Sequence, residues 1–159
     1  MEIRAGDILF LDTNILLTAT DESRTHNKIA RDLIASHHRI GLHFGISGQV
    51  IREYLVVATR TPNVNGLGME SADALSNVSE FSKQLLFFEE SEVVSHQLQL
   101  LTRKYQLVGT HIHDANVVAT LLAHGLSKLV TENPVDFSVF SEVETTDLLG
   151  FSAMVRQSD

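Results

Sequence analysis

Four acidic residues stand at positions where the chain is otherwise apolar, although they lie far apart in sequence: Asp12, Glu53, Asp114 and Asp136. Asp12 closes the apolar run 8–11, and Asp136 follows the short run 129–130 and a turn. A carboxylate in apolar surroundings is costly unless it has a partner, and a divalent metal ion is the obvious partner for several of them. A fold that accommodates this sequence therefore has to bring these acids either to a shared cation or to water.

Helical spacing indicates that two of the acids point inward. Positions +3, +4, +7 and +8 from Asp114 are all apolar: Val117, Val118, Leu121 and Leu122. Positions −3, +1 and +4 from Glu53 are likewise core residues: Val50, Tyr54 and Val57. On an α-helix these spacings share one face, so each acid belongs to the face that packs against the rest of the protein.

Short apolar runs alternate with longer amphipathic stretches along the chain. We expect strands at 8–11, 40–46, 87–88, 129–130 and 144–149. We expect helices at 27–36, 48–59, 71–86, 91–105 and 113–125, the second of them capped by Ser47 or Gly48. The segment 61–68 is expected to be a loop. This alternation predicts an α/β fold with a mainly parallel, twisted sheet and helices on both faces. No linker or repeat divides the chain, so we predict one domain over 1–159 with its core at about 8–151.

Composition excludes several classes of protein. No apolar run approaches the roughly 20 residues of a membrane span, and the first residues do not resemble a signal peptide, which together favour a cytoplasmic protein. The absence of cysteine excludes disulfides and thiolate metal sites. The net charge of -8 argues against broad electrostatic affinity for nucleic acid. It does not exclude a nuclease with a few local cations, and it suits a protein partner with basic segments.

Topology favours a single site for the acids. In open α/β sheets ligands bind beyond the carboxyl ends of the strands, where Asp12 and Asp136 are expected, and a helix N-terminus such as that near Asp114 can face the same edge. Two carboxylates about 4 Å apart repel by about 4 kcal/mol at an effective dielectric of 20, so a cluster must either take up protons or bind cations. All-oxygen ligands suit Mg²⁺ or Mn²⁺, which can activate water and orient a phosphodiester.

Each acid also has an ordinary structural explanation. Asp12 could be the N-cap or turn residue after a strand, and Glu53 could be solvated at the edge of its stripe. Asp114 could serve the helix dipole, and Asp136 belongs to a good turn sequence, Asn-Pro-Val-Asp. The case for one site therefore depends on the four positions taken together.

Four segments carry a resemblance to a known family: Leu-Asp-Thr-Asn (11–14), Val-Ile-Arg-Glu-Tyr (50–54), His-Asp-Ala-Asn-Val-Val-Ala-Thr (113–120) and Thr-Glu-Asn-Pro-Val-Asp-Phe (131–137). In this order they resemble PIN domains, and more narrowly the VapC-like ribonuclease toxins of type II toxin–antitoxin systems. The loop 58–68 is similar to the same branch. The resemblance implies an endoribonuclease dependent on Mg²⁺ or Mn²⁺, and a homodimer held silent by a cognate antitoxin.

The resemblance also assigns roles to individual residues. Asp12, Glu53 and Asp114 would be the metal-binding acids, Thr13 or Asn14 would position the site, and Thr131 would support it by hydrogen bonding. Many relatives carry an acid two residues after this threonine, where the present chain has Asn133. Either Asn133 or Asp136 would fill the fourth position, and the site would hold one ion or two.

The remaining candidates are cations and histidines. Arg52 or Arg60 would contact substrate phosphate, although Arg60 could instead pair with Glu53 or cap its helix. Zinc is a weaker hypothesis, since His37-His38 suit a helix end and His113 suits local capping as well as substrate contact.

Two rival functions remain open. A phosphatase of the haloacid dehalogenase type also places an aspartate after its first strand, but it usually needs a second one where this chain has Asn14. A catalytically degenerate PIN-like binding module is the other rival, against which the intact trio Asp12, Glu53 and Asp114 argues.

Overall fold

A five-stranded parallel sheet forms the centre of the described molecule. The structure is a computed structural model that describes residues 1–36 and 41–157. The strands are β1 (Ile8–Leu11), β2 (His43–Ser47), β3 (Leu86–Phe88), β4 (Lys128–Val130) and β5 (Glu144–Thr146). They lie in the order β3-β2-β1-β4-β5, and every neighbouring pair is parallel. The predicted α/β class and parallel sheet are confirmed.

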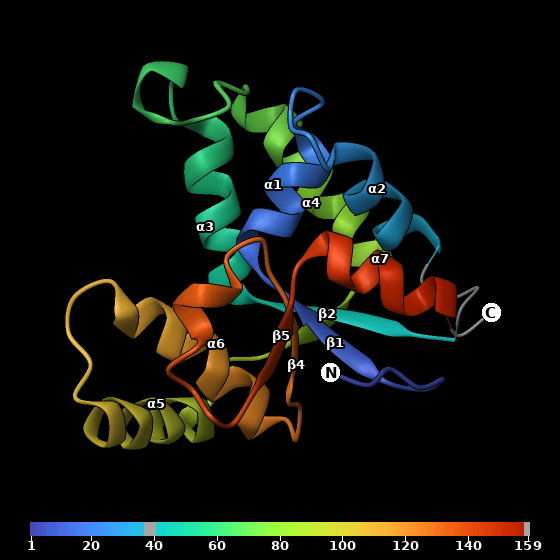
Figure 1. The fold of residues 1–159 in the computed structure, drawn as a ribbon. Helices are drawn as coiled ribbons and strands as arrows, with labels where there is room; N and C mark the ends of the chain where they lie inside the picture. Colours follow the sequence, from blue (N-terminus) through green and yellow to red (C-terminus); the bar gives the residue numbers. More distant parts are fainter. Residues whose placement is uncertain (37–40, 158–159) are drawn as a thin grey trace.

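Helices cover both faces of this sheet. They are α1 (Thr13–Thr20), α2 (Asn27–Ser36), α3 (Gly48–Thr59), α4 (Ser71–Gln84), α5 (Glu92–Tyr105), α6 (His111–Ala123) and α7 (Leu148–Gln157), with short 3-10 turns η2 (Pro62–Val64) and η3 (Pro134–Phe137). The pair α5 and α6 lies on one side of the sheet, and α1, α2 and α7 lie on the other (Figure 1). Helix α3 contacts both α1 and α4. No helix within the described ranges is long and apolar enough to cross a membrane.

Most predicted elements are present, with small shifts at their ends. The helix expected at 71–86 ends at Gln84, because the chain turns there into β3. Helix α6 begins two residues earlier than expected, at His111, and Gly125 beyond its end has the left-handed φ of 69° that favours glycine. The strand expected at 40–46 occupies His43–Ser47. Its expected start and His37-His38 belong to 37–40, outside the described residues.

Two helices were not predicted. Helix α1 follows β1 directly, and its buried Ile15, Leu16 and Leu17 leave no polar face from which a helical period could be recognised. The last strand was predicted to run to Leu149, which is wrong, because Leu148 already begins α7. The Asp147 carboxylate accepts the Gly150 N–H at 2.6 Å, and this cap ends the extended segment and starts the helix.

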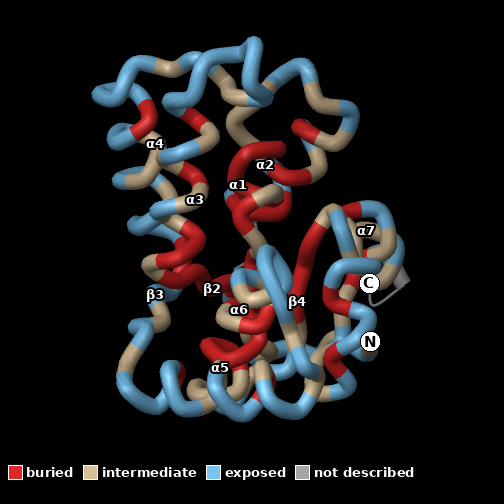
Figure 2. The backbone as a smooth tube through the Cα atoms, turned by 90° about the vertical axis from the view of Figure 1, so that its left-hand side faces the viewer, coloured by how far each residue is buried: buried red, intermediate tan, exposed pale blue. Residues whose placement is uncertain are grey.

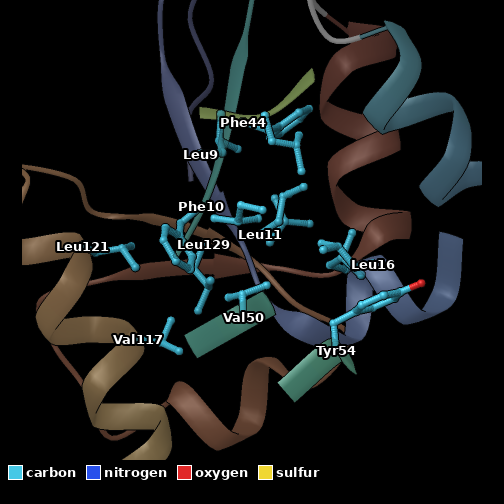
Figure 3. Packing of buried hydrophobic residues seen from close by; sticks show 14 of the residues in the cluster. Leu9, Phe10, Leu11, Leu16, Phe44, Val50, Tyr54, Val117, Leu121 and Leu129 are labelled. Atoms are coloured by element: carbon cyan, nitrogen blue, oxygen red, sulfur yellow. The ribbon is translucent and has the colours of Figure 1, made fainter. Parts of the chain in front are cut away.

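The core lies on both faces of the central strands, where buried residues concentrate (Figure 2). Side chains from α1, α3 and α6 surround those of β1 (Figure 3). The Phe44 ring of β2 lies 5.6 Å from the Phe151 ring of α7, centroid to centroid. The next residue of β2, Gly45, leaves room for the Phe88 ring, since a Cβ at Gly45 would fall 2.1 Å from Phe88 Cε2. This packing fixes β1 and β2 between the helices, and with them the segments that follow their carboxyl ends.

Candidate active site

Asp12 lies at the carboxyl end of β1, where its carboxylate accepts hydrogen bonds from residues that follow β1 and β4. Its Oδ1 accepts the Thr13 N–H at 2.7 Å, which makes it the N-cap of α1. Its Oδ2 accepts from Asn14 Nδ2 at 2.7 Å and from Thr131 Oγ1 at 2.6 Å. Thr131 follows β4 and is completely buried. The structure therefore brings Asp12 together with both residues predicted to support it.

The loop after β4 is fastened to α1 through the same residues. Asn14 Oδ1 accepts the backbone N–H of Glu132 at 3.0 Å, and Asn14 Nδ2 also donates to Thr131 Oγ1 at 3.0 Å. Thr131 Oγ1 further accepts the Asn133 N–H at 3.1 Å. The Asn133 side chain is exposed, as is that of Asp136, and both stay candidates for the fourth position.

Glu53 approaches the site from the second turn of α3. Its Oε2 accepts from Thr13 Oγ1 at 2.9 Å, which joins it to the residue directly after Asp12. Its Oε1 accepts from Gln49 Nε2 at 2.8 Å. The Glu53 side chain is 38% exposed. Both carboxylate oxygens thus have protein donors while the group still faces solvent.

Asp114 on α6 and Asp136 on η3 are the other two acids of the group. Asp114 lies in the first turn of α6, and its side chain is 28% exposed. Burial raises the pKa of Asp114, and the negative charges of Asp136 and Glu53 raise it further. Asp136 is exposed on η3, which contacts α6. It therefore lies close enough to influence Asp114 through its charge.

The electrostatic state of Asp12 shows the same coupling. Burial raises its pKa from 3.8 to about 6, against the lowering effect of the hydrogen bonds from Thr131 and Thr13. The negative charges of Glu53 and Asp114 contribute to the rise. Asp12 after β1 and the acids of α3, α6 and η3 therefore influence one another through their charges.

The donor chemistry of this edge fits a hard divalent cation. Within residues 1–36 and 41–157 no three His, Asp or Glu side chains are gathered closely enough to enclose an ion in this conformation. The acids nevertheless offer only oxygen ligands, and burial, with a further contribution from their mutual repulsion, raises the pKa of Asp12 and of Asp114. A bound cation would relieve that repulsion, and Mg²⁺ or Mn²⁺ suits such ligands.

Comparison with known proteins decides the family. The sequence profile of the PIN domain matches residues 9–143, which contain Asp12, Glu53, Asp114 and Asp136. The chain belongs to the PIN domain family. This membership sets aside the phosphatase alternative. No curated protein matches the sequence.

Solved structures share the fold of this PIN domain. VapBC2 from Rickettsia felis bound to promoter DNA is similar with a TM-score of 0.66 and 17% identity, over 88% of this chain and 98% of that chain. DNA-bound VapBC from Salmonella typhimurium is similar with a TM-score of 0.63 and 19% identity, over 88% of this chain and 97% of that chain. Mycobacterium tuberculosis VapC20, a sarcin-ricin loop cleaving toxin, is similar with a TM-score of 0.60 and 16% identity, over 86% of this chain and 97% of that chain. At these identities the likeness concerns the fold.

The two arginines occupy different places in the PIN domain. Arg52 Nη2 contacts Glu90 Oε2 at 3.2 Å, and its side chain is 66% exposed. It borders a pocket of about 270 Å³ that is also lined by Gln49, Glu53, Leu98, Ile112, His113 and Asn116. Arg60 lies at the far end of α3, where its backbone N–H binds Val56 O as the C-cap. Arg52 is therefore the arginine beside the acids.

Histidines border the acidic group without forming a zinc site in the described chain. His113 Nδ1 lies 3.9 Å from Glu53 Oε1, and His111 Nδ1 lies 3.7 Å from Asp114 Oδ2. Both side chains are largely exposed, at 72% and 59%. They are placed to meet a ligand that approaches the edge from solvent.

Three residues of the site were missed at the sequence level: Gln49, Glu90 and Asn116. Gln49 precedes Glu53 by one helical turn, and its side chain links α3 to α6. Glu90 follows β3 and accepts the Gln49 N–H and the Arg52 guanidinium. An acid just after a strand was the signal that identified Asp12, and the same signal identifies Glu90. Asn116 gave no such signal, because its partner lies in a different helix.

Proposed function

We propose that this PIN domain is a Mg²⁺- or Mn²⁺-dependent endoribonuclease and the toxin component of a type II toxin–antitoxin module. The observation that carries the proposal is the convergence of Asp12, Glu53 and Asp114 from three elements onto one edge. Burial and mutual repulsion raise the pKa of Asp12 to about 6. Carboxylates whose pKa is raised by burial and by neighbouring negative charges are typical of functional sites.

The residues at this edge would have separate roles in binding the ion, orienting its ligands and contacting the substrate. Asp12, Glu53 and Asp114 would hold the ion, while Thr13, Asn14 and Thr131 keep two of these carboxylates in orientation. When bound, the ion supplies positive charge to a phosphodiester and makes water more acidic. Arg52, exposed beside the same edge, would contact a substrate phosphate.

A partner protein and self-association belong to the same proposal. The similar structures from Rickettsia felis and Salmonella typhimurium are VapBC complexes. The net charge of -8 complements a partner with basic segments. We therefore propose a cognate antitoxin as the regulator, a homodimer as the assembly and the cytoplasm as the location. Light scattering of the purified chain measures the dimer directly.

Cleavage of RNA under control of the metal tests the function. Purified, antitoxin-free protein is incubated with total bacterial RNA over a range of Mg²⁺ and Mn²⁺ concentrations, beside Asp114→Asn. The matched control is Asp73→Asn, which alters another first-turn helical acid, exposed on α4. We expect wild type and Asp73→Asn to cut RNA only with metal, and Asp114→Asn to lose most of the rate. Metal-independent cleavage or absent cleavage by wild type contradicts the proposal, and absent cleavage supports the binding-module alternative.

A further inference from the structure

Gln49 makes three side-chain hydrogen bonds in the first turn of α3, and its residue is only 4% exposed. Its Nε2 donates to Glu53 Oε1 at 2.8 Å and to the backbone carbonyl of His113 at 3.0 Å. Its Oε1 accepts from Asn116 Nδ2 at 2.6 Å. The side chain therefore touches a carboxylate on α3 and the backbone carbonyl directly before Asp114 on α6.

We propose that Gln49 is a positioning residue that sets the Glu53 carboxylate relative to Asp114 and thereby determines the affinity of the site for its divalent ion. The inference rests on the proposed function, since it assumes that both acids are ligands. It goes beyond that function by assigning the geometry of the ligand set to a neutral residue that acts through its hydrogen bonds to Glu53 and to the His113 carbonyl.

The direction of the Gln49 amide is imposed by its surroundings. Because Asn116 donates to Oε1, the nitrogen of the amide has to face the two acceptors, Glu53 and the His113 carbonyl. Glu90 anchors the arrangement from outside, since it accepts the backbone N–H of Gln49 and lies 3.5 Å from Asn116 Nδ2. The Gln49 side chain is buried although Glu53 and Asn116 are partly exposed, and donation to a carboxylate is stronger than donation to a neutral group.

The second oxygen of Glu53 extends the chain of contacts to Asp12. Thr13 donates to Glu53 Oε2, and the Thr13 N–H donates to Asp12 Oδ1. Asp12, Glu53 and the start of α6 are thus linked by consecutive hydrogen bonds through Thr13 and Gln49. A change at Gln49 would release Glu53 Oε1, the oxygen that also lies 3.9 Å from His113 Nδ1, and leave the bond from Thr13 to Oε2 intact.

The experiment measures Mn²⁺ affinity by calorimetry on the antitoxin-free protein. Gln49→Met keeps the size of the side chain and removes its donors, whereas Gln49→Glu places a carboxylate against the acceptors Glu53 and His113 O. Partners of metal ligands typically contribute about 10- to 100-fold to affinity or activity, so we expect losses of about this size, larger for Gln49→Glu. The matched control is Gln99→Met on the exposed face of α5, which should bind Mn²⁺ as wild type does.

Kinetics separate positioning from a general loss of structure. If Gln49 acts through the ion, saturating Mn²⁺ restores the kcat of Gln49→Met while the KM for RNA stays unchanged. A folded Gln49→Met variant with wild-type Mn²⁺ affinity overturns the proposal. If that variant does not fold, Asn116→Leu takes its place, because it removes the bond that orients the amide, and unchanged affinity there overturns the proposal equally. Failure of wild type to bind Mn²⁺ overturns the proposed function instead.

Discussion

The raised pKa of Asp12 makes the stability of the metal-free protein depend on pH in a defined direction. Folding raises this pKa from 3.8 to about 6, so the folded state holds the proton more tightly than the unfolded state does. The stabilisation from protonated Asp12 is therefore fully present below pH 3.8 and is lost as pH rises through about 6. A difference of about two pKa units corresponds to about 3 kcal/mol in total, of which about 2 kcal/mol falls between roughly pH 4.5 and 8.

The perturbation that isolates this contribution is Asp12→Asn. An amide at position 12 has one oxygen, so it cannot accept from both Thr13 N and the donors Asn14 and Thr131, and the variant will be less stable by a constant amount. That constant amount does not depend on pH. The informative quantity is the change with pH of the difference in unfolding free energy between wild type and variant.

Urea unfolding in EDTA from pH 4.5 to 8, followed by circular dichroism, measures that quantity. We expect wild type to lose about 2 kcal/mol more than Asp12→Asn over this range. The exposed control Asp73→Asn should follow wild type. Saturating Mg²⁺ should remove most of the wild-type loss, because the ion stabilises the ionised carboxylate. If wild type and Asp12→Asn lose stability in parallel, the burial and repulsion assigned to Asp12 are wrong.

Three further predictions concern single contacts, each measured by urea unfolding. Gly45→Ala should cost about 1–3 kcal/mol, because the new Cβ would lie 2.1 Å from Phe88 Cε2, and unchanged stability would contradict this packing. Thr131→Val should cost about 1–3 kcal/mol and weaken Mn²⁺ binding, since it removes the donor to Asp12, whereas Thr131→Ser should retain both properties. Asp147→Ala should cost about 1 kcal/mol by uncapping α7, and Asp147→Asn should recover most of it; equal loss in both would argue against the cap.

The fold could be predicted where one face of an element is polar. Helix α3 shows the spacing of Val50, Tyr54 and Val57, so its bounds follow closely from the sequence. Helix α1 is buried nearly all round, and a short apolar segment directly after a strand has no helical period to recognise. The sequence allows Asp12 as an N-cap or as a turn residue, and Asp12 is the N-cap of α1, a helix that the sequence did not predict. The capping role of Asp147 was available in the sequence but was overlooked in favour of a longer strand.

The sequence indicates the acids of the candidate site but not the contacts that hold them. Asp12, Glu53 and Asp114 follow from strand ends and helical faces, and the structure places them at one edge. Gln49 lies 64 residues from His113, so the bond between them depends on how α3 and α6 are packed. Spacing along one helix carries no information about such a contact. The same limit applies to Asn116, whose partner on α3 is 67 residues away.

Calorimetric titration of Mn²⁺ into the purified, antitoxin-free protein tests the central claim most directly. Wild type, Asp114→Asn and Asp73→Asn are compared at neutral pH in the same buffer. We predict that wild type and Asp73→Asn bind with equal affinity and that Asp114→Asn loses most of the heat, because the proposed site uses Asp114 as a ligand. Absence of binding by wild type, or equal binding by all three proteins, would contradict the conclusion that these acids form one metal site.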